Sequence, residues 1–284
     1  MISFFQAAVL GLSQGITELF PISSLGHSVL LPGLLGWKID ENADYFLTFL
    51  VATHFATALT LFAIYWKDWM RIVKGIFRSL AEREIATPDA RLGWLLVVTT
   101  IPAGLAGVLF ETQVQNFFIA PASAAFFLIL NGGLLFMAER LRKRAKASDQ
   151  KVRDPDHRIA AELSWRQSLK IGLLQVIALI PGFSRTGSTL AGGLMVGLSH
   201  EDALRYSFLL ATPIIGAAAI LKLPPLLASG NATTVGIALT GAVAAAVGAY
   251  FSARFLAQYF KTRTLAPFAA YCIAIGTLGL LILR

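Results

Sequence analysis

The stretch LIPGFSRTGSTLAGG, residues 179–193, breaks a long apolar segment with polar groups that hydrocarbon would not accommodate. It holds one arginine, Arg185, and four hydroxyl side chains within the six residues 184–189. Pro181 removes a backbone donor and ends a helix, and nearby glycines let the backbone take conformations that other residues avoid. We therefore expect a broken helix whose polar loop faces something other than lipid.

The composition of the whole chain indicates that its solvent is a bilayer. The 284 residues are 56% hydrophobic and 14% charged, with a mean hydropathy of +0.68, whereas a soluble domain has about 25% charged residues. A membrane crossing needs roughly 20 mainly apolar residues. The apolar segments are 2–36, 45–66, 92–110, 119–138, 168–198, 204–227, 234–256 and 265–283. The sequence therefore predicts an all-α polytopic membrane protein.

Two of these segments differ from the other six because a proline and polar residues interrupt each near its middle. The interruptions are ELFPISSLGHS in segment 2–36 and LIPGFSRTGST in segment 168–198. Unwound backbone is tolerated at membrane depth only where it lines a protein-enclosed or water-filled cavity. We predict six transmembrane helices plus two re-entrant helix–loop–helix hairpins, with two kinked spans as the alternative for the broken segments.

The basic residues predict the orientation. Residues 67–91 hold six Lys or Arg residues and residues 139–170 hold ten. Two spans separate these loops, so they share a side, and the positive-inside rule makes that side the cytoplasm. Both termini and the turns at 111–118 and 228–233 are then expected outside. The net charge of +8 is explained by these loops, and no nucleic-acid partner is expected.

The two broken segments resemble each other in sequence. A shift of 161 residues aligns GLSQGITELFPISSLGHS, residues 11–28, with GLLQVIALIPGFSRTGST, residues 172–189. This similarity predicts repeat one over 1–138, a basic cytoplasmic linker over 139–167 and repeat two over 168–284. Each repeat would hold one hairpin and three spans, so the repeats are inverted. Inverted repeats bring their broken helices together near the membrane midplane, which predicts one shared site.

The first polar loop offers acid, hydroxyl and imidazole groups. Gln14 and Glu18 lie four residues apart, on one face of a helix, and form a candidate metal-binding pair. A carboxylate inside a membrane marks a functional site, although Glu18 could also sit at the interface or cap a neighbouring helix. Ser24 and His27 follow within nine residues of it, and His27 alone would equally suit a structural role.

The second polar loop has the groups that bind phosphate. The planar guanidinium of Arg185 suits phosphate oxygens, and a structural salt bridge to Glu18 is an alternative compatible with that role. The candidate phosphate-binding residues are Ser23, Ser184, Arg185, Thr186, Gly187 and Thr189. The candidate catalytic residues are Glu18, Ser24, His27 and Arg185. Charge stabilisation, a nucleophile and an acid or base are what phosphoryl transfer requires.

Two motifs give a specific resemblance. QGITELFPISSLGH, residues 14–27, and PGFSRTGST, residues 181–189, resemble the signature motifs of the undecaprenyl-diphosphate phosphatase family, the bacterial bacitracin-resistance membrane phosphatases. The likeness covers nearly the whole chain. It implies hydrolysis of the C55 polyprenyl diphosphate to the monophosphate, which recycles the lipid carrier for cell-wall synthesis. It also implies the bacterial inner membrane, six spans, two re-entrant hairpins and an inverted repeat.

The resemblance transfers roles to individual positions. The positions that match the family's motifs are Glu18, Ser24, His27, Ser184, Arg185 and Thr189. Gln14 departs from the many members that have Glu there and could hold a divalent cation between two carboxylates. A Mg²⁺ or Ca²⁺ site is therefore weaker here, because hard cations favour carboxylate oxygens. No organic cofactor is expected.

Several alternatives remain open from the sequence. Ser24 is the favoured nucleophile, activated by Glu18 or His27, but a His27 nucleophile or a water activated by Glu18 also fits. His54, in segment 45–66, is a candidate for lining the cavity or for helix packing. The rival function is a transporter of the prenyl phosphate carrier, since broken helices at the midplane are a transporter signature. The expected partners are the prenyl diphosphate substrate, membrane lipids and a second copy in a homodimer.

Overall fold

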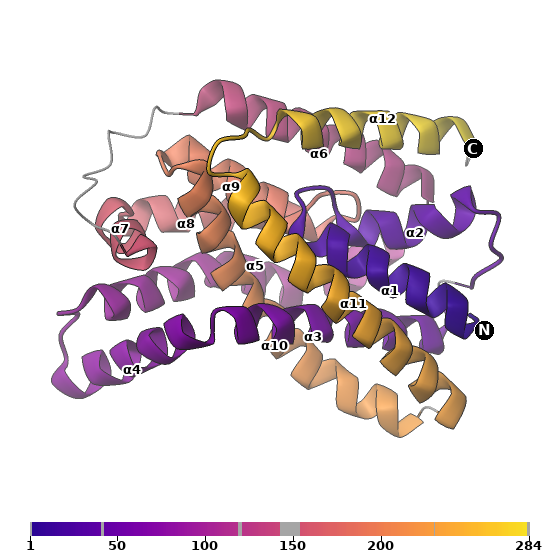
Figure 1. Cartoon of the computed structure of the whole chain (residues 1–284), viewed down its shortest axis with the longest axis horizontal. Coiled ribbons are helices and arrows are strands. Elements are labelled where there is room, and N and C mark those ends of the chain that lie inside the picture. The colour runs from indigo at the N-terminus through magenta and orange to yellow at the C-terminus, as the bar shows by residue number, and fades with distance from the viewer. Residues whose placement is uncertain (1, 41–42, 119–120, 143–153, 230, 283–284) are drawn as a thin grey trace.

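A computed structural model describes residues 2–40, 43–118, 121–142, 154–229 and 231–282, and within these ranges the only regular structure is helical (Figure 1). The helices of the first half are α1 (Phe4–Leu19), α2 (Ser24–Leu34), α3 (Asp44–Ile64), α4 (Trp66–Glu82), α5 (Pro88–Phe118) and α6 (Pro121–Leu141). Those of the second half are α7 (Pro155–Glu162), α8 (Trp165–Gln175), a 3₁₀ turn η1 (Val176–Leu179), α9 (Arg185–Val196), α10 (His200–Ser229), α11 (Ala232–Tyr259) and α12 (Ala266–Ile282).

The helices confirm the prediction of a multi-pass, all-α membrane protein. Among the described residues, five helical segments are long and apolar enough to cross a bilayer, within α3, α5, α6, α10 and α11. The apolar α12 has 17 residues and is shorter than these five. All six lie where the sequence predicted spans.

Both predicted breaks are present, and the same kind of cap follows each one. α1 ends one turn before α2 begins, with Pro21 in the gap, and the η1 turn and Pro181 separate α8 from α9. The hydroxyl of Ser23 accepts a hydrogen bond from the Gly26 backbone N–H at 3.2 Å, and the hydroxyl of Ser184 accepts one from the Gly187 N–H at 3.0 Å. Each polar loop therefore leads directly into a helix N-terminus.

The connections differ from the prediction in three places. The basic loop expected over 67–91 contains the amphipathic helix α4, which packs against α5 through its buried residues Ile72, Gly75 and Ser79. The turn expected at 111–118 is wrong, because α5 continues to Phe118. The linker predicted over 139–167 contains the short helix α7, and residues 143–153 of this linker lie outside the described residues.

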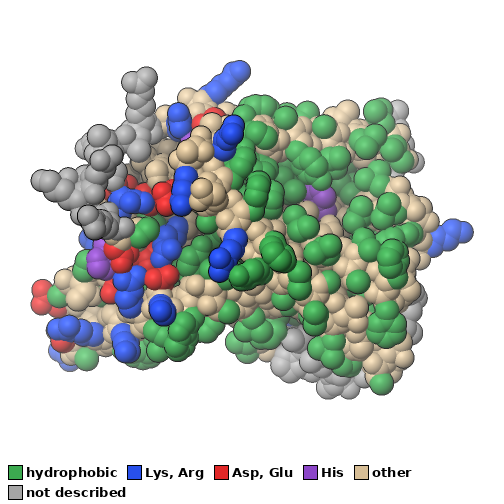
Figure 2. All heavy atoms as spheres, in the orientation of Figure 1, with side chains coloured by type: hydrophobic (Ala, Val, Ile, Leu, Met, Phe, Trp, Pro, Cys, Tyr) green, Lys and Arg blue, Asp and Glu red, His purple; other side chains and the backbone are tan. Residues whose placement is uncertain are grey.

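The two basic connections meet at one end of the molecule, as predicted. A guanidinium nitrogen of Arg71 in α4 donates to the Asp154 carboxylate at 2.7 Å, and Nε of Arg91 donates to the Ala160 carbonyl at 2.6 Å. Figure 2 shows charged side chains gathered at this end, while hydrophobic side chains cover most of the remaining visible face. A molecule with one charged end and an apolar belt suits insertion across a bilayer.

Small residues position the broken helices against their neighbours. A Cβ at Gly11 or Gly15 of α1 would clash with the backbone of α11 at Gly241 or Ala245. A Cβ at Gly172 of α8 would clash in the same way with the Thr99 carbonyl of α5. Small residues at helix crossings let backbones approach closely in membranes. The first half of the chain therefore packs mainly against the second half, and the two loops are held side by side.

Candidate active site

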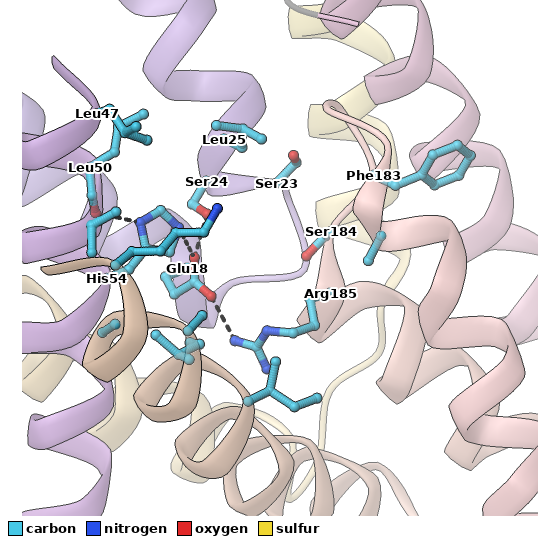
Figure 3. Close-up of a pocket in the computed structure, with 17 residues that line it drawn as sticks. Glu18, Ser23, Ser24, Leu25, Leu47, Leu50, His54, Phe183, Ser184 and Arg185 are labelled. Carbon is cyan, nitrogen blue, oxygen red and sulfur yellow. Dashed lines mark hydrogen bonds and ion pairs between the residues drawn. The ribbon is translucent and has the colours of Figure 1, made fainter. Parts of the chain in front are cut away.

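The two polar loops open onto one cavity of about 330 Å³, which α3 and α10 complete (Figure 3). Its polar lining residues are Glu18, Ser23, Ser24, His54, Ser184, Arg185 and Lys222. The remaining wall is apolar, mostly from α3 and α10, and includes Leu50 and Ile215. A mostly apolar cavity with a few converging polar groups is the usual form of a ligand site.

The carboxylate of Glu18 is at the centre of the site and contacts four side chains, of which Figure 3 shows Arg185, His54 and Ser24. Its Oε1 accepts a hydrogen bond from Arg185 Nη2 at 2.6 Å. Its Oε2 lies 3.3 Å from His54 Nε2 and accepts from Gln14 Nε2 at 3.1 Å and from the Ser24 hydroxyl. Glu18 is 7% exposed, so these partners replace the water that a carboxylate would otherwise require.

Arg185 forms the predicted salt bridge with Glu18 and still has a buried donor left over. Its Nη2 bonds the carboxylate, whereas its Nη1 is buried and has no hydrogen-bond partner among the described residues. An unpaired buried polar group costs about 1–3 kcal/mol of stability. The Arg185 side chain also lines the cavity, so its salt bridge to Glu18 and a role in phosphate binding are compatible in one geometry.

Ser24 has the geometry of an activated nucleophile. It begins α2, and its hydroxyl donates a hydrogen bond to Oε2 of Glu18 while facing the cavity. A nucleophile within hydrogen-bond reach of a base that a third group orients is the recurring arrangement in covalent catalysis. Here Arg185 and Gln14 orient the carboxylate of Glu18.

His54 joins this cluster from α3. Its Nδ1 lies 2.8 Å from the Leu50 carbonyl, which leaves Nε2 aimed at Glu18. Both ring nitrogens therefore face oxygen acceptors. The residue that the sequence offered as a candidate either for lining the cavity or for helix packing lines the cavity and contacts the central carboxylate.

His27 lies elsewhere, although it follows Ser24 by three residues. Its Nδ1 donates to the Ser23 carbonyl at 2.7 Å, and its Nε2 lies 3.0 Å from the Tyr271 hydroxyl. The two rings also stack, with centroids 5.7 Å apart. The structure does not bring His27 into the cavity with Glu18, and its contacts join α2 to α12.

The residues of the second loop divide into two groups. Ser184 and Arg185 line the cavity, as Ser23 of the first loop does. Thr186 instead donates to the Glu18 carbonyl at 2.9 Å, and the Thr189 hydroxyl lies 2.5 Å from that of Ser207 in α10. Ser184 already caps the N–H of Gly187. Thr186, Gly187 and Thr189 therefore hold the loop in place and do not line the cavity.

Two further residues of the site were not predicted from the sequence. Asn131 of α6 is fully buried, accepts a hydrogen bond from the Ser184 N–H at 3.0 Å and donates to the Pro21 carbonyl at 3.0 Å. It therefore ties one polar loop to the other. Lys222 of α10 lines the cavity and adds a positive charge. The available signals were a lone amide and a lone lysine within apolar segments.

The residues around Glu18 offer few ligands for a metal ion. Within the described part of the chain, no three His, Cys, Asp or Glu side chains are grouped so that they could hold one. Gln14 Oε1 is buried and has no partner there, so it is an available oxygen ligand beside the Glu18 carboxylate. These two oxygens fit a hard cation only if substrate oxygens supply most of its remaining ligands.

Comparison with known proteins places the chain in a family. The family model described as bacitracin resistance protein BacA matches residues 7–278. An undecaprenyl-diphosphatase of Mycolicibacterium paratuberculosis is 46% identical, covering 97% of this chain and 95% of the relative. One from Acidiphilium cryptum is 43% identical, covering 98% and 97%. Undecaprenyl-diphosphatase 2 of Frankia alni is 40% identical, covering 98% and 97%. The chain belongs to the bacitracin resistance protein BacA family.

Proposed function

We infer that this chain is an undecaprenyl-diphosphate phosphatase. As a hydrolase it converts the diphosphate lipid to undecaprenyl phosphate and inorganic phosphate, which renews the carrier for cell-wall synthesis and confers bacitracin resistance. The names of relatives that match over nearly the full chain support this activity. The decisive structural observation is that the permanently charged Arg185 lines the same cavity as the Ser24–Glu18 pair.

The proposed reaction uses these groups in sequence. Arg185 and Lys222 bind the terminal phosphate, and Glu18 accepts the proton of the Ser24 hydroxyl. Ser24 Oγ bonds to the terminal phosphorus while the bond from phosphorus to the bridging oxygen breaks, and undecaprenyl phosphate leaves. Water then hydrolyses the phosphoserine, releasing inorganic phosphate and restoring the hydroxyl. Buried cationic donors stabilise the charge on the transferring phosphoryl group.

The other two nucleophiles are distinguishable from Ser24. Water activated by Glu18 would give the same products without a phosphoserine, and a His27 nucleophile would give an acid-labile phosphohistidine. Acid quenching of the enzyme with diphosphate labelled at its terminal phosphorus should trap label on Ser24. Turnover without any trapped label in wild type, together with substantial turnover by Ser24→Ala, would support the water mechanism. The contacts of His27 with Tyr271 favour a structural role.

A divalent cation is a proposal that the structure supports only weakly. Glu18 and the amide oxygen of Gln14 would be its protein ligands, together with diphosphate oxygens. When bound, Mg²⁺ or Ca²⁺ would neutralise charge on the leaving phosphate. A chelator followed by each metal in turn tests this, and Gln14→Leu should weaken the response of turnover to metal while leaving metal-free turnover in place.

The finer topology is also proposed. Six spans and two re-entrant hairpins form an inverted repeat of 1–138 and 168–284 about the linker 139–167. The alike capping of α2 and α9 and the glycine packing of α1 and α8 support it. We place the protein in the bacterial inner membrane with both termini periplasmic. In a Cys272→Ser background, Glu84→Cys should be labelled only from the cytoplasm and Lys38→Cys only from outside.

A homodimer stays a prediction, and it is tested by measuring the intact mass of the protein in detergent.

The function is tested by phosphate release from C55 polyprenyl diphosphate by purified protein. Arg185→Ala and Glu18→Gln should lower turnover by at least about 10²-fold each, because each removes charge stabilisation or the base. Arg166→Ala, which removes an exposed arginine of α8, is the matched control and should keep wild-type turnover. Near-wild-type turnover in both site variants would refute the proposed site.

The rival function is a transporter of the prenyl phosphate, because two broken helices sharing one cavity also suit a carrier. A carrier needs binding groups but no nucleophile. Transfer of the monophosphate across a vesicle membrane can be measured for Ser24→Ala. If this hydrolytically inactive variant still transfers the monophosphate, the protein has a carrier function as well. If wild type transfers no monophosphate, hydrolysis is the only function of the two.

A further inference from the structure

A second hollow lies at the C-terminal part of α3, apart from the residues of that helix that line the cavity, and runs along α11. Its apolar section has a volume of about 590 Å³ between α3 and α11 and is lined by residues such as Ala63, Val247 and Phe251. Its polar section, of about 260 Å³, lies towards the charged end of the molecule, and the first turns of α10 form its base. Ile64 and Arg254 line both sections. The two sections therefore form one groove that is apolar at one end and polar at the other.

The polar section is positively charged. Arg254 and Lys261 are both exposed, and neither forms an ion pair with any carboxylate in the described part of the chain. They are seven residues apart, two helical turns, so they fall on one face of α11 and its end. Arg205 also lines this section, but Asp156 and Asp68 neutralise it. Glu201 is the one carboxylate among the residues that line the section.

The groove lies where a lipid would meet the protein. α3 and α11 are both long enough to span a bilayer, and the polar section lies beside the charged end, where the helices leave it. In Figure 2, Lys and Arg side chains border the hydrophobic side chains on this face. Arg254 lies over the ring of Tyr250, 5.1 Å from its centroid, which holds the guanidinium at the junction of the two sections.

We propose that this groove binds an anionic glycerophospholipid, with an acyl chain in the apolar section and the headgroup phosphate on Arg254 and Lys261. An apolar slot that ends in two unneutralised cations complements a lipid in shape and charge. Cations near a membrane surface attract anionic headgroups. The site is separate from the cavity around Glu18, so the proposal does not depend on the phosphatase activity.

The test is lipid binding by purified protein in detergent, followed by native mass spectrometry. Wild type should retain one phosphatidylglycerol more tightly than phosphatidylcholine. Arg254→Gln with Lys261→Gln should weaken phosphatidylglycerol binding about 30-fold, the effect expected of two surface cations. Lys74→Gln with Arg166→Gln removes the same charges from exposed positions on α4 and α8 and should leave this binding unchanged.

Three arms distinguish a lipid seated in the groove from nonspecific adhesion, a phosphate site or a dimer interface. Ala246→Phe should weaken binding by filling the apolar section, and inorganic phosphate should not compete. Lys261→Gln alone should weaken phosphatidylglycerol binding about 5-fold. Because Lys261 lies beyond the end of α11, this variant tests the proposal even if the double variant unfolds. Unchanged phosphatase turnover in each variant reports an intact fold. Equal binding of both lipids, competition by phosphate, or a dimer mass that these variants abolish would overturn the proposal.

Discussion

Each side chain that contacts the carboxylate of Glu18 has a different role. Arg185 supplies the compensating charge, Gln14 fixes the orientation, and Ser24 presents the proton to be removed. His54 adds a second positively polarised contact. Because the carboxylate is buried, its position depends on these side chains and little on solvent. A change to any one of them is therefore expected to alter how the carboxylate serves the others.

Ser24→Ala should lower phosphate release by at least about 10³-fold, since loss of a nucleophile removes most of the rate enhancement in covalent catalysis. KM should change little, because Arg185 and Lys222 remain. The measurement is steady-state turnover with C55 polyprenyl diphosphate. Ser13→Ala, on α1 and outside the cavity, is the control and should behave as wild type. Equal turnover of Ser24→Ala and its control would remove Ser24 from the mechanism.

Asn131→Leu should lower kcat by roughly 10²-fold while KM changes less, because a small shift of the loops misplaces reacting groups. The variant leaves the Ser184 N–H unpaired, which costs about 1–3 kcal/mol of stability, and leaves the Pro21 carbonyl with only the Cys272 thiol as a donor, at 3.8 Å. Thr57→Val removes a buried hydrogen bond within α3 alone and should keep its kcat. A loss of stability without a change in kcat would show that Asn131 supports the fold and does not position the loops.

At this scale the sequence predicted the residues whose chemistry is unusual in a membrane. Glu18 and Arg185 stand out as charges in apolar segments, and their salt bridge was foreseen as an alternative. Asn131 was missed because one amide in an apolar segment does not reveal which backbone groups it will meet. His27 lies outside the cavity for a similar reason, since its neighbour Tyr271 comes from a helix 244 residues away in sequence.

Among the elements, α1 holds Glu18 in place through its glycines. Gly15→Ala should lower both the thermal unfolding midpoint and phosphate release, because the added Cβ meets the backbone of α11. Gly104 of α5 has no atoms within 4 Å of an added Cβ. Gly104→Ala should therefore leave activity unchanged and raise stability slightly, since alanine favours a helix by about 1 kcal/mol over glycine. Equal behaviour of the two variants would show that the α1–α11 crossing does not position Glu18.

The sequence predicted the breaks in helices better than the helices between spans. Pro21 and Pro181 have a local effect on the backbone, so each break could be predicted from a few residues. Helix α4 was interpreted as a charged loop because its charges were counted without regard to their period. Its buried residues Ile72, Gly75 and Ser79 recur at intervals of three and four, which is the spacing of one helix face.

Across the whole molecule, ion pairs at the charged end join the two halves. Arg71 donates to Asp154 at 2.7 Å, which connects α4 to the residue that caps α7. Partial burial raises the pKa of Asp154, but the hydrogen bonds from Arg71 and from the Asp156 backbone N–H, together with the charge of Arg71, lower it more, so the pKa lies below its ordinary value. A lowered pKa in the folded state means that this contact stabilises the fold only while Asp154 is ionised.

Arg71→Gln should lower the thermal unfolding midpoint in detergent by a constant amount above about pH 5. As the pH falls below about 4, the ordinary pKa of an aspartate, wild type should lose this advantage and approach the variant. Lys74→Gln, one turn further along α4, is the control and should follow wild type at every pH. A wild-type advantage that persists undiminished at low pH would contradict the role of Asp154.

Composition and loop charge predicted the class of protein and the shared end of its basic connections. They could not predict how the halves interleave, because packing depends on which helix faces meet. The repeat alone is equally compatible with two compact halves placed side by side. In the structure α1 packs on α11 and α8 packs on α5, so each broken helix is supported by a helix of the other half.

This interleaving has a consequence for how the protein is made. Gly11 is synthesised 230 residues before Gly241, the residue it packs against. At typical translation rates that interval lasts roughly 10–50 s. During this time α1, with its carboxylate, lacks the helix that later covers its glycine face. Until α11 is made, the glycine face of α1 must therefore be covered by something other than its final partner. The surroundings of Glu18, the first acidic residue of the chain, are complete only when the last helices have been synthesised.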